Sequence, residues 1–283
     1  SLPIEKGSSW QISPELAQSI IQSRGKVLPK NLVITTKASK GGVGGTTLLF
    51  EVATYFSKFM KVLCIDADPE SHLSNLLYDE NVDYTKIKTL YEVFSQDSSL
   101  DSAIMKTKFK NLDLIPASLR LHKVEKVLSG QNPKKIMRSK IDELKSEYNL
   151  IFVDLSPSLA SSLVISSYLA ADKIFLPAIP NTFSLESIAL TKETIERLCE
   201  EFDVPAKDFK IIFNQHSSKT IASQEILAVL LQQYGNLVMP TYVNQSSAIT
   251  NSINAGQSIF DIKGSKEVKE NFENLSLSML DWI

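Results

Sequence analysis

Short apolar runs alternate with longer amphipathic segments along most of this chain, and this alternation constrains the fold more than any other feature. The runs lack the polar alternation of a half-exposed strand, so they predict strands that are buried on both faces. Repeated strand–helix units predict a mostly parallel twisted sheet with helices on both faces, the α/β class. The predicted strands are 31–36, 61–67, 112–117, 150–156, 173–179, 209–215 and 236–240. The predicted helices are 46–59, 132–148, 158–171, 184–202 and 220–234.

The alternation starts at residue 31, which separates a short first part of the chain from the rest. Residues 1–30 contain one short helical pattern and are too few to form a core of their own. We therefore expect a short N-terminal arm at 1–30 and a single α/β domain at 31–283. The last segment, 266–283, predicts a helix that closes the core. Its apolar face consists of Val268, Phe272, Leu275, Met279 and Trp282.

Composition and charge exclude several classes of protein. Hydrophobic residues make up 43% of the 283 residues and charged residues 22%, which is typical of a globular and not of a disordered chain. A net charge of −2 argues against a uniformly basic nucleic-acid-binding protein, although a local basic patch is compatible with it. No run of about eighteen apolar residues occurs, so we expect no membrane span.

Cysteine and histidine give no sign of a disulfide framework or a metal centre. Cys64 and Cys199 are too few for such a framework and fit a reducing compartment, so we expect a cytoplasmic protein. Cys64 lies inside an apolar run and is predicted to belong to the core. His72, His122 and His216 have no metal-ligand spacing, which favours surface or turn roles.

A glycine-rich loop follows the first predicted strand. It reads KASKGGVGGTT over residues 37–47 and leads into a helix that starts near Thr46. Gly41, Gly42 and Gly44 allow backbone angles that other residues avoid and let amide groups approach an anion. The helix N-terminus adds further amides and a partial positive charge. The loop therefore predicts an anion-binding site, although a plain glycine-rich turn has the same composition.

Three carboxylates follow two other predicted strands. KVLCIDADPES ends its apolar run in Asp66 and Asp68, and LIFVDLSPS ends in Asp154. Because the carboxyl ends of parallel strands meet at one edge of a sheet, we expect these side chains near the loop. Beside bound phosphates they can hold Mg²⁺ through water and orient an attacking water. Either segment alone is compatible with a helix cap or a turn, but together with the loop they predict a nucleotide site.

With these motifs the chain resembles the ParA/MinD family of P-loop ATPases with a deviant Walker A motif, and within it the ParA plasmid and chromosome partition ATPases. The resemblance runs from residue 31 to the end of the chain. It implies a P-loop NTPase fold that binds ATP or ADP with Mg²⁺. Family members carry two loop lysines, as in K-G-G-V-G-K-T-T. Here Lys40 matches the first lysine, and Gly45 stands in the place of the second.

The resemblance implies a role for each residue of the loop. Lys40 matches the signature lysine, which reaches across a dimer to the phosphates of the other subunit's nucleotide. Thr46 would coordinate Mg²⁺, and Thr47 would lie nearer the α-phosphate. The backbone amides that wrap the phosphates would come from Gly41, Gly42, Val43, Gly44, Gly45 and Thr46.

Outside the loop, the resemblance implies two further groups of site residues. Asp68 would position the hydrolytic water, Asp66 would support the metal shell, and Asp154 would be the Walker B carboxylate. Asn214, in the segment FNQ, matches a residue that often contacts adenine. Pro240 begins a stretch that resembles the part of the family that lines the base pocket.

Gly45 keeps a loop amide but lacks the ammonium that family members place between the β- and γ-phosphates. Loss of one charge-assisted contact costs about 1.5–3 kcal/mol, which weakens ATP binding by at least about ten- to a hundredfold. Gly45 is compatible with an engineered substitution, or with a natural member that binds ATP as a switch and hydrolyses it poorly. Another lysine, such as Lys37 or Lys40 of the partner subunit, is a third explanation. We expect an ATPase fold whose hydrolysis is weak or absent.

The resemblance also implies partners and a location. They are a ParB-like centromere-binding protein, nonspecific DNA and a second copy of the chain in an ATP-bound homodimer, on the nucleoid and away from membranes. Candidate DNA contacts are Lys219, Lys263, Lys266, Lys269 and the cluster at 134–140.

Two alternative functions stay open. The first is a MinD-like positioning ATPase at a membrane surface, which the largely acidic and neutral polar side of the 266–283 helix disfavours. The second is a biosynthetic P-loop enzyme of the dethiobiotin synthetase type, which the signature lysine Lys40 disfavours.

Overall fold

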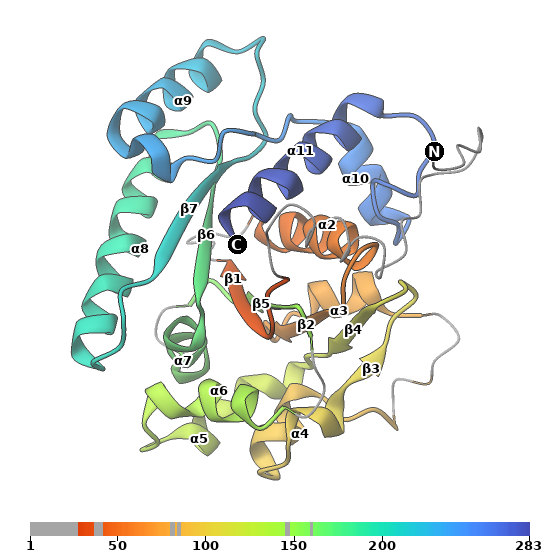
Figure 1. Cartoon of the computed structure of the whole chain (residues 1–283), viewed down its shortest axis with the longest axis vertical. Helices are drawn as coiled ribbons and strands as arrows, with labels where there is room; N and C mark the ends of the chain where they lie inside the picture. The colour runs from red at the N-terminus through yellow and green to blue at the C-terminus, as the bar shows by residue number, and fades with distance from the viewer. Residues whose placement is uncertain (1–27, 37–41, 80–82, 84–85, 145–147, 159–160) are drawn as a thin grey trace.

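Figure 1 shows the computed structural model of the chain. The structure describes residues 28–36, 42–79, 83, 86–144, 148–158 and 161–283. The helical pattern predicted in the N-terminal arm lies outside the described residues.

A central sheet organises the described part of the chain. It has seven strands in the order β3-β4-β2-β5-β1-β6-β7, and every neighbouring pair is parallel except β3 and β4. This arrangement confirms the predicted α/β class. The strands are β1 (Leu32–Thr36), β2 (Val62–Ala67), β3 (Met105–Lys106), β4 (Leu112–Ile115), β5 (Leu150–Leu155), β6 (Lys173–Ala178) and β7 (Asp208–Phe213).

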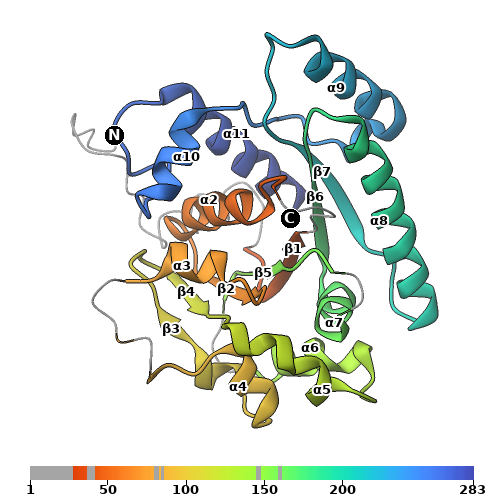
Figure 2. The same cartoon turned by 180° about the vertical axis from the view of Figure 1, so that it is seen from behind.

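Helices cover both faces of the sheet, as Figures 1 and 2 show from opposite sides. One face carries α2 (Gly45–Ser57), α3 (His72–Leu77), α10 (Ser247–Asn254) and α11 (Lys266–Trp282). The other carries α4 (Leu90–Ser95), α5 (Val124–Leu128), α6 (Pro133–Asp142), α7 (Ser162–Ala170), α8 (Thr182–Glu201) and α9 (Ile221–Tyr234). Short 3₁₀ turns are η2 (Leu100–Ala103), η3 (Leu119–Lys123) and η4 (Gly235–Leu237).

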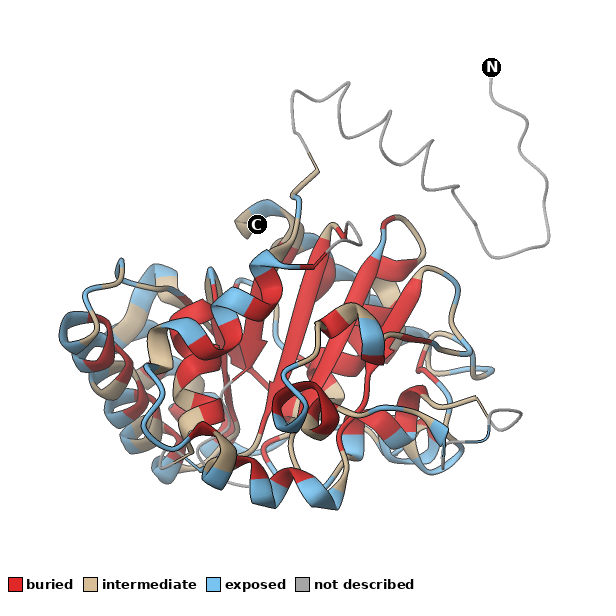
Figure 3. Cartoon of the chain, turned by 90° about the horizontal axis from the view of Figure 1, so that it is seen from below, coloured by how far each residue is buried: buried red, intermediate tan, exposed pale blue. Residues whose placement is uncertain are grey.

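The apolar runs are buried because their strands supply side chains to two separate cores. On β5, Leu150 and Phe152 pack on the side of α2 and α11, whereas Ile151 and Val153 pack on the side of α6 and α7. All four side chains are 0% exposed. Figure 3 shows the strands buried and the outer faces of the helices exposed. A strand that is buried on both faces needs no polar alternation, which explains the continuous apolar runs.

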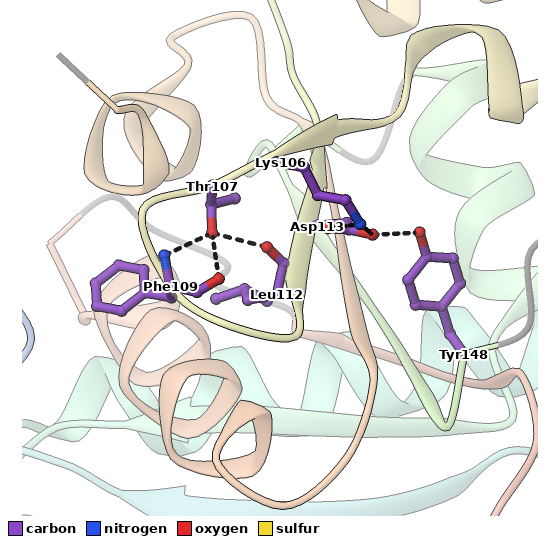
Figure 4. A network of polar contacts seen from close by, with 6 residues as sticks. All are labelled: Lys106, Thr107, Phe109, Leu112, Asp113 and Tyr148. Carbon is purple, nitrogen blue, oxygen red and sulfur yellow. Dashed lines mark hydrogen bonds and ion pairs between the residues drawn. The ribbon is translucent and has the colours of Figure 1, made fainter. Parts of the chain in front are cut away.

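The antiparallel edge of the sheet is held by a polar network that Figure 4 shows. Asp113 of β4 accepts hydrogen bonds from Lys106 Nζ at 2.8 Å and from the Tyr148 hydroxyl at 2.8 Å. Thr107 Oγ1 donates to the Leu112 carbonyl at 2.7 Å, which closes the turn between β3 and β4. These bonds fix a hairpin whose first strand has only two residues.

The strand predicted at 236–240 is wrong. Its first residues form η4, and Val238 makes only an isolated parallel bridge with Ile211 of β7. The Met239 amide donates to the Ile211 carbonyl at 2.8 Å, and Pro240 then has no N–H with which to extend the ladder. The run is apolar because Val238 and Met239 are buried against the sheet.

The helix predicted at the end of the chain is confirmed as α11. Val268, Phe272, Leu275 and Met279 are at most 5% exposed and pack with residues of α2 in one core. Trp282 lies at the margin, where its Nε1 donates to Asp208 Oδ2 at 2.7 Å. This helix therefore covers the helix that follows the glycine-rich loop.

Candidate functional site

The described part of the glycine-rich loop begins at Gly42 and leads directly into α2. Gly42 and Gly44 have φ angles of 87° and 82°, in the left-handed region that favours glycine. Gly44 is the N-cap of α2, and no side chain of the described residues caps this helix. The first amides of α2 thus have no intrahelical acceptor, and their partial positive charge suits an anion.

Two amide side chains from the end of β7 contact the loop. Asn214 Nδ2 donates to the Val43 carbonyl at 2.9 Å, and Gln215 Nε2 donates to the Gly42 carbonyl at 3.2 Å. A Cβ atom on Gly44 would lie 2.5 Å from Asn214 Nδ2, closer than packed atoms allow. Gly44 is therefore required both by its backbone angle and by the approach of Asn214.

Thr46 and Asp154 meet across the first turn of α2. The hydroxyl of Thr46, the second residue of α2, donates to Asp154 Oδ2 at 2.8 Å, and Asp154 lies near the end of β5, the strand beside β1. A hydroxyl and a carboxylate are hard oxygen donors, and Mg²⁺ in phosphate sites takes one or two such ligands beside water and phosphate oxygens. This pair fits Mg²⁺. Among the described residues, this site included, no group of three or more His, Cys, Asp or Glu side chains is arranged to hold a metal ion by itself.

Asp66 and Asp154 are register partners on β2 and β5. Asp66 is 0% exposed and is already used within the protein: its Oδ2 accepts from the Ser74 amide at 2.8 Å and the Ser74 hydroxyl at 2.6 Å, and its Oδ1 accepts from the Asp68 amide at 3.1 Å. Burial raises the pKa of Asp66 to about 6. Burial and the nearby Asp66 carboxylate raise the pKa of Asp154 well above its ordinary value. Asp66 therefore supports the segment that carries Asp68, and its role in the metal shell stays a prediction.

Asp68 lies on the wall of a cavity that the loop also lines. Its Oδ1 accepts from the Glu70 amide at 3.0 Å, which orients the carboxylate at the start of the turn before α3. The cavity has a volume of about 1100 Å³, large enough for a nucleotide. The loop residues from Gly42 to Leu48 line it together with Asp68, Asp154, Asn214 and Gln215.

The far side of the cavity is formed by the segment around α10. Its lining residues there are Asn244, Gln245, Ser246, Ser247, Ile249, Thr250, Ile253, Asn254 and Gly256. Pro240, which was expected at the base pocket, is exposed and does not line this cavity. The stretch that follows Pro240 does reach it. The predicted role of Asn214 at the base is untested, but its Nδ2 is committed to the loop.

Acidic side chains lie on the described walls of the cavity. Asp68, Glu70 and Asp154 line it, and no lysine or arginine does so within the part of the chain that the structure describes. Lys37, Lys40 and Gly41 lie outside the described residues, so their predicted roles stay predictions. At the place of the second family lysine, Gly45 is the first residue of α2 and is buried.

Sequence reasoning missed two sets of site residues. His72 and Asn75 of α3 line the cavity; His72 is also exposed, in agreement with the predicted surface role, but its place at the cavity was not predicted. Gln215 was also missed, and its only signal was its position next to Asn214 in the segment FNQ. Contacts between a loop and a segment more than 170 positions away have no periodic pattern that would show them.

The basic residues proposed for DNA differ in their availability. Lys269 Nζ donates to the Phe260 and Ile262 carbonyls at 3.2 and 2.5 Å and so fixes the loop before α11. In the cluster at 134–140, Lys134 Nζ donates to the Asp203 carbonyl at 2.7 Å, and Lys140 pairs with Asp97 at 2.7 Å.

Three other candidates point outward. Lys219 and Lys263 are exposed, and Lys266 is exposed beside Glu270 at 3.6 Å. Phosphate contacts need such accessible cations.

Comparison with known proteins gives consistent results. A family profile described as "AAA domain" matches residues 31–210. An uncharacterised protein of Methanocaldococcus jannaschii is 29% identical over 89% of this chain and 98% of its own length. The chromosome-partitioning ATPase Soj of Treponema pallidum is 26% identical over 80% of this chain and 87% of its own length.

Solved structures share the fold. A putative plasmid partition protein of Borrelia burgdorferi, bound to AMPPNP, has a TM-score of 0.77 and 22% identity over 89% of this chain and all of that chain. Among the described residues, no helix is both long and apolar enough to cross a membrane.

Proposed function

The chain belongs to the AAA domain family, within its ParA/MinD group of P-loop ATPases with a deviant Walker A motif, and from this premise we propose that it is a DNA-partition ATPase. It acts as an ATP-dependent dimerising switch, and Gly45 weakens its hydrolysis.

One observation carries the proposal: an uncapped helix N-terminus and two left-handed glycines share a cavity of about 1100 Å³ with Asp68 and the Thr46–Asp154 pair. Backbone amides bind phosphate oxygens, and the hydroxyl–carboxylate pair suits Mg²⁺. Magnesium, when bound, neutralises phosphate charge. Asp68, held by the Glu70 amide, accepts a hydrogen bond from the attacking water and so orients it.

The weakened hydrolysis follows from charge. The transition state of phosphoryl transfer spreads negative charge over the phosphate oxygens, and the described walls of this cavity offer three carboxylates but neither lysine nor arginine. Gly45 does not have a positive φ angle, so its backbone position does not require glycine. A lysine at this position would not need a left-handed backbone and would supply the missing charge.

The partners follow from the relatives and not from the charge balance. Proteins named for chromosome and plasmid partition are similar over most of this chain. The proposal therefore includes nonspecific DNA, a ParB-like partner that stimulates hydrolysis, an ATP-bound homodimer and a cytoplasmic location on the nucleoid. Exposed lysines such as Lys219 and Lys263 would contact DNA phosphates.

Calorimetric titration with Mg²⁺–ATP tests the nucleotide site. We expect the unmodified chain to bind ATP and its Gly45→Lys variant to bind at least about ten- to a hundredfold more tightly, because a charge-assisted contact is added. Turnover should rise by more, since charge develops in the transition state. Equal affinity and equal turnover in the two proteins would refute the weakened site, and no ATP binding by either protein would refute the ATPase.

Light scattering and sedimentation test the partners. We expect ATP to convert the monomer to a dimer, and the dimer to sediment with plasmid DNA but not with anionic liposomes. Retention by liposomes alone would instead favour a positioning ATPase at a membrane surface.

A further inference from the structure

We propose that Asn214 and Gln215 form a carbonyl clamp that presets the phosphate loop of this chain, and that Asn214 acts through the loop and not by contacting the base. The inference rests on the proposed function, because it assigns positioning residues to the same nucleotide site. The clamp is defined as the two hydrogen bonds from Asn214 Nδ2 to the Val43 carbonyl and from Gln215 Nε2 to the Gly42 carbonyl.

The clamp decides where loop amides point. In a planar trans peptide, the carbonyl and the following N–H lie on opposite sides of the bond. Fixing the Gly42 carbonyl therefore fixes the amide of Val43, and fixing the Val43 carbonyl fixes the amide of Gly44. Two of the amides that the site offers to phosphate are thus oriented before any ligand arrives, which lowers the ordering cost of binding.

The clamp is itself held rigidly. The Asn214 amide donates to the Ala178 carbonyl at 2.7 Å, which ties it to the end of β6. The next residue but one, His216, donates through its amide to the Val243 carbonyl at 2.9 Å, and its Nδ1 lies 2.8 Å from Ser223 Oγ. The clamp therefore stands between two fixed points, one on the sheet and one on α9.

The same segment also joins the loop to the far side of the cavity. The Gln245 amide donates to the His216 carbonyl at 2.8 Å, and Gln245 lines the cavity beside α10. A single stretch of chain thus positions the loop on one side and the α10 segment on the other.

Gln215 has a backbone that costs energy to maintain. Its φ angle is 55°, in the left-handed region that residues other than glycine seldom adopt. Such strain persists where surrounding contacts over-determine it. Here the strained backbone places the Gln215 side chain on the Gly42 carbonyl.

Gly45 makes the clamp more important in this chain. In family members the second loop lysine contacts the phosphates, whereas this chain has no side chain at that position. Among the described residues, phosphate binding then depends on the loop amides and on the metal pair Thr46 and Asp154. Without the clamp, the loop amides would no longer be held in one orientation. Position 45 carries no ammonium that could make up for the resulting loss of phosphate binding.

Hydrogen exchange of the ligand-free protein tests the clamp without depending on nucleotide. Asn214→Asp keeps the shape of the side chain but replaces the donor with an oxygen, and Gln215→Ala removes the half-buried donor to the Gly42 carbonyl. We expect exchange of a peptide covering residues 42–50 to be about tenfold faster in both variants. Asn75→Ala, which changes another cavity-lining amide without a loop contact, is the matched control and should leave this exchange unchanged. Unchanged exchange in both clamp variants would overturn the proposal.

A comparison of two ligands then distinguishes a role of Asn214 in the clamp from a contact between Asn214 and the base. Tripolyphosphate has no base, so with Mg²⁺ it probes the loop alone. We expect Asn214→Asp to weaken tripolyphosphate and ATP by the same factor, about tenfold. If Asn214→Asp weakened the binding of ATP but left the binding of tripolyphosphate unchanged, Asn214 would contact the base and the proposal would be overturned. If the unmodified chain binds neither ligand, the proposed function fails, and the exchange experiment still decides whether the clamp exists.

Discussion

At the scale of single residues, Gly42 and Gly44 differ in what surrounds them although both have left-handed backbones. A Cβ on Gly42 would meet nothing within 4 Å, whereas a Cβ on Gly44 would lie 2.5 Å from Asn214 Nδ2. Left-handed strain alone costs about 1–2 kcal/mol for a residue with a side chain. We expect Gly42→Ala to lower the free energy of unfolding by this amount, as measured by urea denaturation.

Gly44→Ala should cost more, because the new methyl group displaces Asn214 and leaves the buried Val43 carbonyl without its donor. An unpaired buried acceptor adds about 1–3 kcal/mol. Gly130→Ala is a control for strain alone, since Gly130 has a φ angle of 77° in open space. Equal losses for Gly42→Ala and Gly44→Ala would contradict the close contact.

A buried carboxyl on α2 makes stability depend on pH. Glu51 is 0% exposed and accepts hydrogen bonds from the Ser258 hydroxyl at 2.6 Å and the Ile259 amide at 3.0 Å. The pKa of Glu51 is raised from 4.5 to about 7, chiefly by burial and to a smaller extent by the charge of Asp261, while the hydrogen bonds from Ser258 and Ile259 and the charge of Lys58 act to lower it. The folded chain therefore binds a proton at Glu51 more tightly than the unfolded chain does.

The contribution of Glu51 to stability is thus fully present below about pH 4.5 and is lost as pH rises to about 7. We expect the free energy of unfolding to fall by up to about 3 kcal/mol across this window from Glu51 alone. Glu51→Gln, which stays neutral, should show a flatter dependence of Tm on pH between 5 and 8. Parallel curves for the two proteins would show that Glu51 titrates normally.

At the scale of secondary-structure elements, α11 stabilises the fold by covering α2 with one apolar face. Leu275 is 0% exposed on that face, and Leu277 on the same helix is 49% exposed. Truncation of a buried leucine removes transfer free energy and leaves a cavity, so Leu275→Ala should cost about 2–5 kcal/mol. Leu277→Ala should change the free energy of unfolding by at most about 0.5 kcal/mol. Similar losses for both variants in urea denaturation would contradict the packing of α11.

Among the secondary-structure elements, the long buried strands could be predicted from the sequence and the shortest elements could not. Strands such as β2 and β5 were predicted because burial on both faces leaves a continuous apolar run. Shorter elements were missed: β3 has two residues and α3 has six, too few for a periodic signal. The run at 236–240 was wrongly predicted to be a strand, because the burial of Val238 and Met239 does not by itself produce a hydrogen-bonded ladder.

Site prediction stopped at a similar limit. The loop and the three carboxylates have local sequence patterns, and the structure brings Thr46, Asp68 and Asp154 to one cavity. The contact between Gln215 and Gly42 depends on two segments that meet only in the folded chain, so neither segment alone indicates it.

At the scale of the whole molecule, a net charge of −2 means that DNA binding must use a local group of cations. Several candidates are already occupied within the fold. Lys269 and Lys134 hold backbone carbonyls, and Lys140 pairs with Asp97. Exposed lysines in the loops before α9 and α11, Lys219 and Lys263, are better placed for phosphate contacts.

Salt dependence distinguishes these two groups of lysines. The logarithm of the binding constant falls linearly with the logarithm of the salt concentration. Each phosphate contact releases counterions and makes this negative slope steeper by about 0.9. We therefore expect Lys219→Ala and Lys263→Ala each to reduce the magnitude of this slope by about 1 per protomer, and to do so equally for unrelated duplex sequences. The measurement is fluorescence anisotropy with ATP between about 50 and 200 mM salt. Lys134→Ala is the matched control. The Lys134 ammonium already donates to the Asp203 carbonyl, so we expect this substitution to leave the slope unchanged. A slope that changes only with Lys134 would move the DNA-binding surface to α6, since a cation contributes to this slope only where it neutralises a phosphate.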